Sequence, residues 1–125
     1  MDVIRVADYV QLASNGLISN EKTIAENPDL VRRMVQAILK GISDSIADPE
    51  EAYRISEKYV EGLASQDKAL QMEILTATID LWKAERLGES QPAAWENMHA
   101  VLVDMNLIPE SLDVSRAYTN QFITP

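Results

Sequence analysis

One long amphipathic helix is the feature of this sequence that most constrains its fold. The segment from Asn27 to Ala47 opens with Asn-Pro-Asp, which supplies a helix cap, a proline suited to the first helical position and an acidic first turn. Apolar residues then recur at helical spacing on one face: Leu30, Val31, Met34, Val35, Ile38, Leu39, Ile42 and Ile46. This face is wider than a coiled-coil seam, so we predict that it packs against a large surface.

Gly41 interrupts this helix and has two interpretations. A glycine inside a helix costs about 1 kcal/mol relative to alanine, so its presence fits the close approach of another backbone at that point. A neutral surface glycine fits equally well. The sequence leaves both interpretations open.

Four further helices are predicted, approximately at residues 48–60, 65–88, 91–108 and 111–123. Asp-Pro-Glu-Glu and Gln-Pro start the first and third of these, while Asn106 stands where a left-handed cap ends the third. The helix over 65–88 carries two apolar stripes, one of Leu70, Ile74, Ala77 and Leu81 and one of Met72, Leu75, Ile79 and Trp82. Such a helix is expected to be buried on two sides.

The amino-terminal end has a different pattern. Residues 2–10 alternate and are rich in β-branched side chains, which predicts a strand, and residues 17–19 predict a second short one. An isolated strand pair is marginal in water, so these strands need partners that this chain barely supplies. The predicted fold class is mostly α with a short N-terminal β segment.

Composition excludes several classes of function. A chain of 125 residues with 46% hydrophobic residues fits one domain. The net charge of -9 opposes binding to nucleic acid or to an anionic membrane surface, so no nucleic-acid partner is expected. The absence of cysteine excludes disulfides and thiolate sites. No apolar run reaches the roughly 20 residues that span a bilayer.

No catalytic constellation is visible in the sequence. His99 is the only histidine, and no serine stands in a Gly-x-Ser-x-Gly elbow. We therefore predict no catalytic residues, no metal site and no cofactor, and we predict that the chain is not an enzyme.

Asp8 and Tyr9 are the one pair that we single out as candidate ligand-binding residues. At the end of a strand, a carboxylate and an aromatic ring together hold a cationic or heteroaromatic ligand by charge pairing and stacking. The alternative is a solvent-facing acid beside a core tyrosine.

Several segments resemble, in order and spacing, the carboxy-terminal part of an ABC-transporter substrate-binding protein of the NMT1/THI5-like family. The most specific is Asn-Pro-Asp-Leu-Val-Arg-Arg at 27–33, followed by Ala-Ile-Leu-Lys-Gly at 37–41 and Asp-Pro-Glu-Glu-Ala at 48–52. Val-Ile-Arg-Val-Ala-Asp-Tyr-Val at 3–10 and Asn-Gly-Leu-Ile-Ser-Asn-Glu at 15–21 complete the likeness. This family includes carriers of thiamin pyrimidine precursors and is similar to the sulfonate and nitrate binders.

The resemblance implies a partial lobe of a periplasmic-binding-protein type II α/β fold. Residues 1–125 would form a single partial domain, with 1–19 as hinge or crossover strands and 27–123 as a helical region. Asp8 and Tyr9 would face the ligand cleft. The implied function is a C-terminal segment that helps deliver a small molecule, such as a thiamin pyrimidine precursor, to an ABC permease. The implied location is periplasmic or extracytoplasmic, with the signal outside this chain.

A chain that is only part of such a fold leaves apolar helix faces and strand edges uncovered, so we predict a homodimer. The alternative function is a free-standing helical domain for oligomerisation or protein interaction, which would use the same apolar faces.

Overall fold

A computed structural model describes residues 4–13 and 15–124. The chain divides into two compact units. The described residues of Met1–Pro28 and Glu89–Pro125 form the first unit, and Asp29–Gly88 forms the second. Helices dominate both units, and no strand forms among the described residues. The prediction of a mostly α chain is therefore confirmed.

The second unit contains the long helix α2, which spans Pro28–Ala47 as the sequence predicts. Val31 on α2 is buried, whereas Leu30 and Met34 are 54% and 51% exposed. Only part of the wide apolar face is therefore covered within the described structure. An added Cβ at Gly41 would meet no atom within 4 Å, which favours the interpretation of Gly41 as an open surface position.

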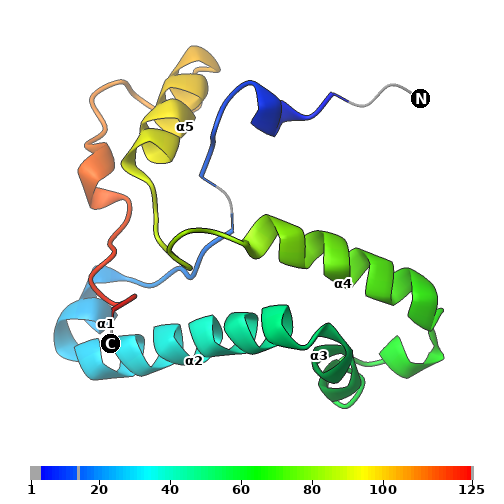
Figure 1. The fold of residues 1–125 in the computed structure, drawn as a ribbon. Helices are drawn as coiled ribbons and strands as arrows, with labels where there is room; N and C mark the ends of the chain where they lie inside the picture. The colour runs from blue at the N-terminus through cyan, green and yellow to red at the C-terminus, as the bar shows by residue number, and fades with distance from the viewer. Residues whose placement is uncertain (1–3, 14, 125) are drawn as a thin grey trace. The chain divides into compact units, whose positions relative to one another are not determined.

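Side-chain caps position the next two helices, α3 (Pro49–Ser56) and α4 (Lys68–Trp82). The Asp48 carboxylate accepts a hydrogen bond from the Glu51 backbone N–H at 3.0 Å, and Asp67 caps α4 in the same way. A short 3-10 helix, η2 (Leu63–Ser65), lies between them. Within this unit α4 turns back along α2 (Figure 1). Both helices end earlier than predicted, at Ser56 and Trp82.

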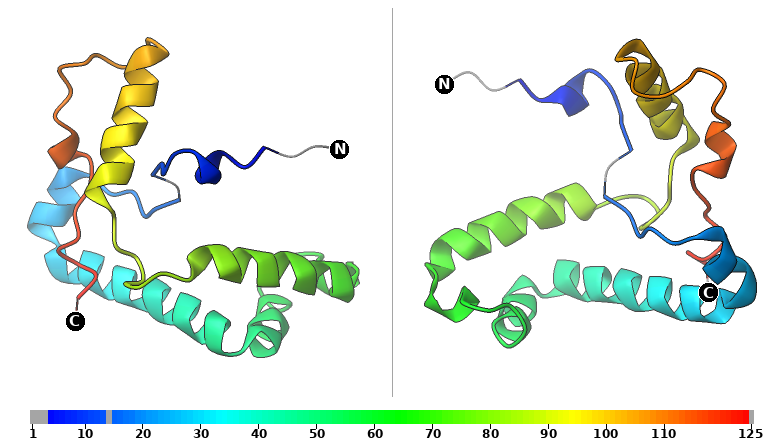
Figure 2. Two further views of the ribbon diagram at one scale, coloured as in Figure 1. Left: turned by 45° about the horizontal axis from the view of Figure 1, so that its top comes forward. Right: turned by 180° about the vertical axis from the view of Figure 1, so that it is seen from behind.

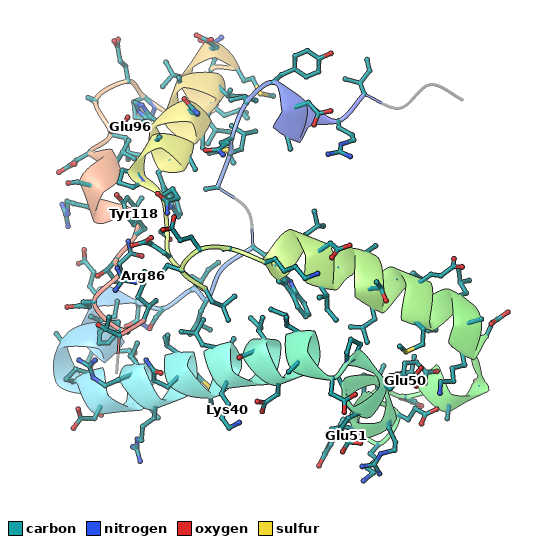
Figure 3. The ribbon with its side chains drawn as sticks, viewed as in Figure 1. Lys40, Glu50, Glu51, Arg86, Glu96 and Tyr118 are labelled. Atoms are coloured by element: carbon teal, nitrogen blue, oxygen red, sulfur yellow. The ribbon has the colours of Figure 1, made fainter. Side chains whose placement is uncertain are left out.

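Tyr53 and Ile79 form the buried core of α3 and α4, with exposures of 4% and 3%. The ammonium group of Lys68 lies 5.6 Å from the centre of the Tyr53 ring. It also lies 2.9 Å from the carboxylate of Glu50, which Figure 3 labels on α3. The hydrogen bond to Glu50 raises the pKa of Lys68. One side of α4 is thus buried, but Leu70, Ile74 and Leu81 on the other side are 53%, 51% and 85% exposed. Burial on two sides does not occur in the described structure.

Gly88, the last residue of the second unit, packs closely against Leu39 on α2. Its substitution provides a test of this packing. Its φ of +81° is a left-handed conformation that favours glycine, and a Cβ built there would lie 2.5 Å from Cδ2 of Leu39. Gly88→Ala is therefore expected to lower the free energy of unfolding by about 1–3 kcal/mol, measured by urea denaturation. Gly16→Ala is the matched control, because nothing lies within 4 Å of that site. Equal stability of the two variants would contradict the packing at Leu39.

The first unit contains α1 (Glu21–Glu26), α5 (Pro92–Asp104) and two short 3-10 helices. The cap at Asn106 is confirmed: its φ is 56°, and the N–H of Leu107 donates to the Leu102 carbonyl at 2.9 Å. The N–H of Asn106 donates to the Val103 carbonyl at 2.8 Å. Together these bonds form a Schellman motif.

The helix predicted over 111–123 is wrong. Only η3 (Val114–Arg116) is helical there. The side chain of Asp113 accepts hydrogen bonds from both the backbone N–H and the hydroxyl of Ser115, at 3.0 and 2.6 Å, which favours a tight turn over a continued helix. The same hydrogen bonds lower the pKa of Asp113.

The strands predicted over 2–10 and 17–19 are not present in the described residues; residues 2 and 3 lie outside them. The 3-10 helix η1 (Val6–Asp8) replaces the first strand, and residues 17–19 have no regular structure. A strand needs a neighbour to satisfy its backbone groups, and the described chain offers none. The Asp8 N–H therefore donates locally to the Arg5 carbonyl at 3.0 Å. The short N-terminal β segment was wrong for this reason.

Candidate functional site

Asp8 and Tyr9 lie at the end of η1 in the first unit. Asp8 is the last residue of this turn, and Tyr9 follows with its N–H donating to the Val6 carbonyl at 3.0 Å. The Asp8 carboxylate lies 3.3 Å from the guanidinium of Arg5, and both side chains are largely exposed. Tyr9 is 82% exposed, so it is not the core tyrosine of the alternative interpretation. A carboxylate and an uncovered ring therefore stand side by side in sequence on one short turn.

The segment that carries this pair is attached to α5. The side-chain amide of Asn97 donates a hydrogen bond to the Gln11 carbonyl at 3.0 Å. This contact holds the chain two residues after Tyr9. The hydrogen bond links the segment that follows η1 to α5, and the side chains of Asp8 and Tyr9 remain exposed to solvent.

A second segment packs on the opposite side of α5. The Trp95 ring stacks on Tyr118 with centroids 5.3 Å apart and planes 10° from parallel. Trp95 and Asn97 are two positions apart, which corresponds to roughly 200° around a helix. Within the first unit, α5 therefore lies between the N-terminal segment and the C-terminal segment (Figures 1 and 2).

Asn120 fastens the C-terminal segment to the start of α5. Its side chain accepts from the Ser90 N–H and donates to the Ser90 carbonyl, both at 2.9 Å. Arg116 pairs with Glu21 at 2.9 Å, and Phe122 is 6% exposed. These contacts hold together the first unit, to which the Asp8–Tyr9 turn belongs.

Sequence reasoning did not find Asn97 or Asn120. Their partners lie 86 and 30 residues away in the chain, so no local pattern could indicate them. His99 also lies on α5, and its Nε2 atom is buried without a hydrogen-bond partner.

The chemistry available at this site is binding. An exposed aromatic ring can stack on a planar ligand, and a carboxylate can accept hydrogen bonds from its N–H groups. Across the described residues, no group of three or more His, Asp or Glu side chains could hold a metal ion. In the helices that the structure describes, none has the length and apolar character of a membrane span.

The second unit has a surface feature of its own. A shallow depression of about 420 Å³ runs along one side of α4. It is lined by Ala69, Met72, Glu73, Thr76, Ala77 and Asp80. All of these residues belong to one helix, so the depression is a helix surface rather than an enclosed ligand site.

Comparison with known proteins agrees with the resemblance seen in the sequence. Residues 1–52 match the family described as NMT1/THI5 like. The chain is also 32% identical over 128 residues to the riboflavin-binding protein RibY of Chloroflexus aurantiacus. That alignment covers 98% of this chain and 36% of that protein, so the chain spans about a third of its relative's length. No solved structure matches the chain significantly.

These matches confirm the predicted resemblance to the NMT1/THI5-like family, which the family model places in residues 1–52. The relative is named as a binding protein and not as an enzyme. The periplasmic-binding lobe is not visible in the described structure.

Proposed function

From the NMT1/THI5-like character of its first 52 residues, we propose that this chain is a segment of a solute-binding protein that presents a small molecule to an ABC permease. The observation that carries the proposal is the likeness to a riboflavin-binding protein along 98% of the chain. In this proposal residues 1–125 act as one partial domain of the carboxy-terminal part of a two-lobed binding fold. The role is binding, without catalysis, and the location is periplasmic or extracytoplasmic.

The ligand class that best fits is a planar nitrogen heterocycle. Riboflavin, which the relative's name gives as its ligand, and the thiamin pyrimidine precursors bound within the family share this chemistry. The uncovered ring of Tyr9 offers a stacking surface, and the neighbouring Asp8 carboxylate offers an acceptor for ring N–H or amino groups. The Asp8 carboxylate also lies 3.3 Å from the exposed guanidinium of Arg5, a surface ion pair that a ligand can displace at little cost.

Replacing Tyr9 tests this assignment directly. In the natural protein that contains these residues, Tyr9→Ala is expected to weaken riboflavin binding about tenfold, because a stacked aromatic pair contributes about 0.5–1.5 kcal/mol beyond its buried area. Asp8→Asn removes the charge and is expected to weaken binding to a comparable degree. Affinity is measured by the quenching of riboflavin fluorescence, and competition with the aminopyrimidine of thiamin separates the two ligand types.

Tyr59→Ala is the matched control for this experiment. Tyr59 is also 82% exposed but belongs to the second unit, away from the candidate pair in sequence. Its substitution should leave affinity unchanged. If Tyr9→Ala binds riboflavin as tightly as the unaltered protein, Tyr9 is not part of the site.

A second function is favoured by the exposed apolar side chains of the second unit. We propose that this chain also associates with a second copy of itself, as a homodimer. Leu30, Met34, Leu70, Ile74 and Leu81 are each at least half exposed, and large exposed apolar patches mark interaction sites.

A further inference from the structure

The exposed apolar residues of the second unit are arranged in two stripes with the spacing of a coiled-coil seam. The α2 stripe consists of Leu30, Met34, Ala37 and Gly41, and the α4 stripe consists of Leu70, Ile74, Ala77 and Leu81. Within each stripe the residues are separated by four, three and four positions. All eight are exposed in the described structure, so each stripe keeps apolar surface that one copy leaves uncovered.

The two stripes are complementary in size. When one α2 stripe is aligned antiparallel to the α4 stripe of a second copy, the facing pairs are Leu30–Leu81, Met34–Ala77, Ala37–Ile74 and Gly41–Leu70. Three of the four pairs join a small residue to a large one, which is how facing layers fill space. This alignment explains why a glycine stands at position 41. The open space beside Gly41 in its own chain would receive Leu70 of the second copy.

The charges beside the stripes are also complementary. Arg33 and Lys40 precede Met34 and Gly41 on α2, and Glu73 and Asp80 precede Ile74 and Leu81 on α4. The two cations are seven residues apart on α2, and the two anions are seven residues apart on α4. The antiparallel alignment therefore brings Arg33 near Asp80 and Lys40 near Glu73 of the second copy. Pairing α2 with α2 would bring cations together, and pairing α4 with α4 would bring anions together. The alignment of α2 with α4 is the one that the charges favour.

The ion pairs that Lys40 and Asp80 already form within one chain are weak enough to be exchanged for contacts with a second copy. Lys40 pairs with Asp44 at 2.7 Å and Asp80 pairs with Lys83 at 2.7 Å, but all four side chains are more than half exposed. Exposed pairs of this kind contribute little, so they can exchange partners. Figure 3 shows Lys40 on the side of α2 that points away from α4 of its own chain.

We propose that the occupant of these surfaces is a second copy of this chain, with the α2 stripe of each copy packed antiparallel on the α4 stripe of the other. Each copy carries one stripe of each kind, so a two-fold pair makes the contact twice. The seam ends at Gly41 and Leu70, because the next layer would place Asp44 against Asp67. This arrangement specifies the surfaces of the proposed homodimer and does not depend on ligand binding.

Charge reversal provides the test. Sedimentation velocity at physiological salt measures the dimer dissociation constant of the unaltered chain and of two double variants. The acid-to-base variant carries Glu73→Lys and Asp80→Lys. The base-to-acid variant carries Arg33→Glu and Lys40→Glu. Each double variant is expected to weaken its own dimer about tenfold or more, because every flanking contact becomes a like-charge pair. Far-UV circular dichroism verifies that each variant retains its helices.

Mixing the two double variants is the decisive arm. An equimolar mixture should form a mixed dimer with near-original affinity, because both α2–α4 contacts then join opposite charges. A variant with all four reversals should likewise dimerise alone. A monomeric unaltered chain, or double variants that dimerise like the original, would overturn the proposal. So would double variants that stay apart when mixed.

Discussion

Replacing Tyr53 with alanine is expected to lower the free energy of unfolding of the second unit by about 3–5 kcal/mol. The ring is 4% exposed and lies under the Lys68 ammonium at 5.6 Å. Truncation therefore leaves a cavity between α3 and α4 and removes a cation–π contact as well. Urea denaturation followed by far-UV circular dichroism measures the loss.

Two companion variants make this result specific. Tyr59 follows six residues later and is 82% exposed, so Tyr59→Ala should change stability by no more than about 0.5 kcal/mol. Tyr53→Phe keeps the ring and its stacking surface, so its cost should stay below about 1.5 kcal/mol. Similar losses for Tyr53→Ala and Tyr59→Ala would show that the α3–α4 core is not where the structure places it.

The second large effect is expected at Phe122 in the first unit. Its side chain is 6% exposed, near the end of a segment that Asn120 fastens to Ser90. Phe122→Ala should cost about 3–5 kcal/mol and loosen the C-terminal segment. Hydrogen exchange of the α5 backbone amides is the measurement, because α5 packs against this segment through Trp95.

Tyr9→Ala serves as the control for Phe122→Ala within the same unit. Tyr9 is 82% exposed, so its replacement should leave the exchange of α5 unchanged. Unaltered protection of α5 in Phe122→Ala would contradict the burial of that ring. Because Tyr9→Ala is also the ligand-binding variant, this control separates a loss of affinity from a loss of structure.

Helix starts could be predicted from the sequence because their chemistry is local. Asp48 and Asp67 accept hydrogen bonds from N–H groups two or three residues ahead, and Asn106 adopts its left-handed conformation at the end of the helix that it terminates. Each of these contacts lies within one helical turn. The same local signal is present at Asn20, whose side chain caps α1 by accepting from the Thr23 N–H at 2.7 Å, but no helix was predicted there.

The elements that could not be predicted depend on distant partners. Residues 2–10 have strand-like composition, but a strand also needs a neighbour, and the described chain forms a local turn instead. Residues 111–123 have the apolar spacing of a helix, but Asn120 is held by Ser90 through contacts that span 30 residues. For the candidate site, the choice of Asp8 and Tyr9 came from their residue types, from their place at the end of a predicted strand and from the family resemblance, and the structure replaces that strand with a 3-10 turn. Their exposure and the anchor at Asn97 became apparent only in three dimensions.

The connectivity of the two units has a consequence for the order in which they fold. The first unit joins two ends of the chain that are separated by the whole of Asp29–Gly88, and closing a flexible loop of that length costs about 3–4 kcal/mol of chain entropy. The contact of Gly88 with Leu39 shortens this loop, because it returns the end of the second unit to its first helix. Folding of the second unit therefore lowers the entropic barrier for the first. A defect at Gly88 would slow assembly of residues that lie far from it in sequence.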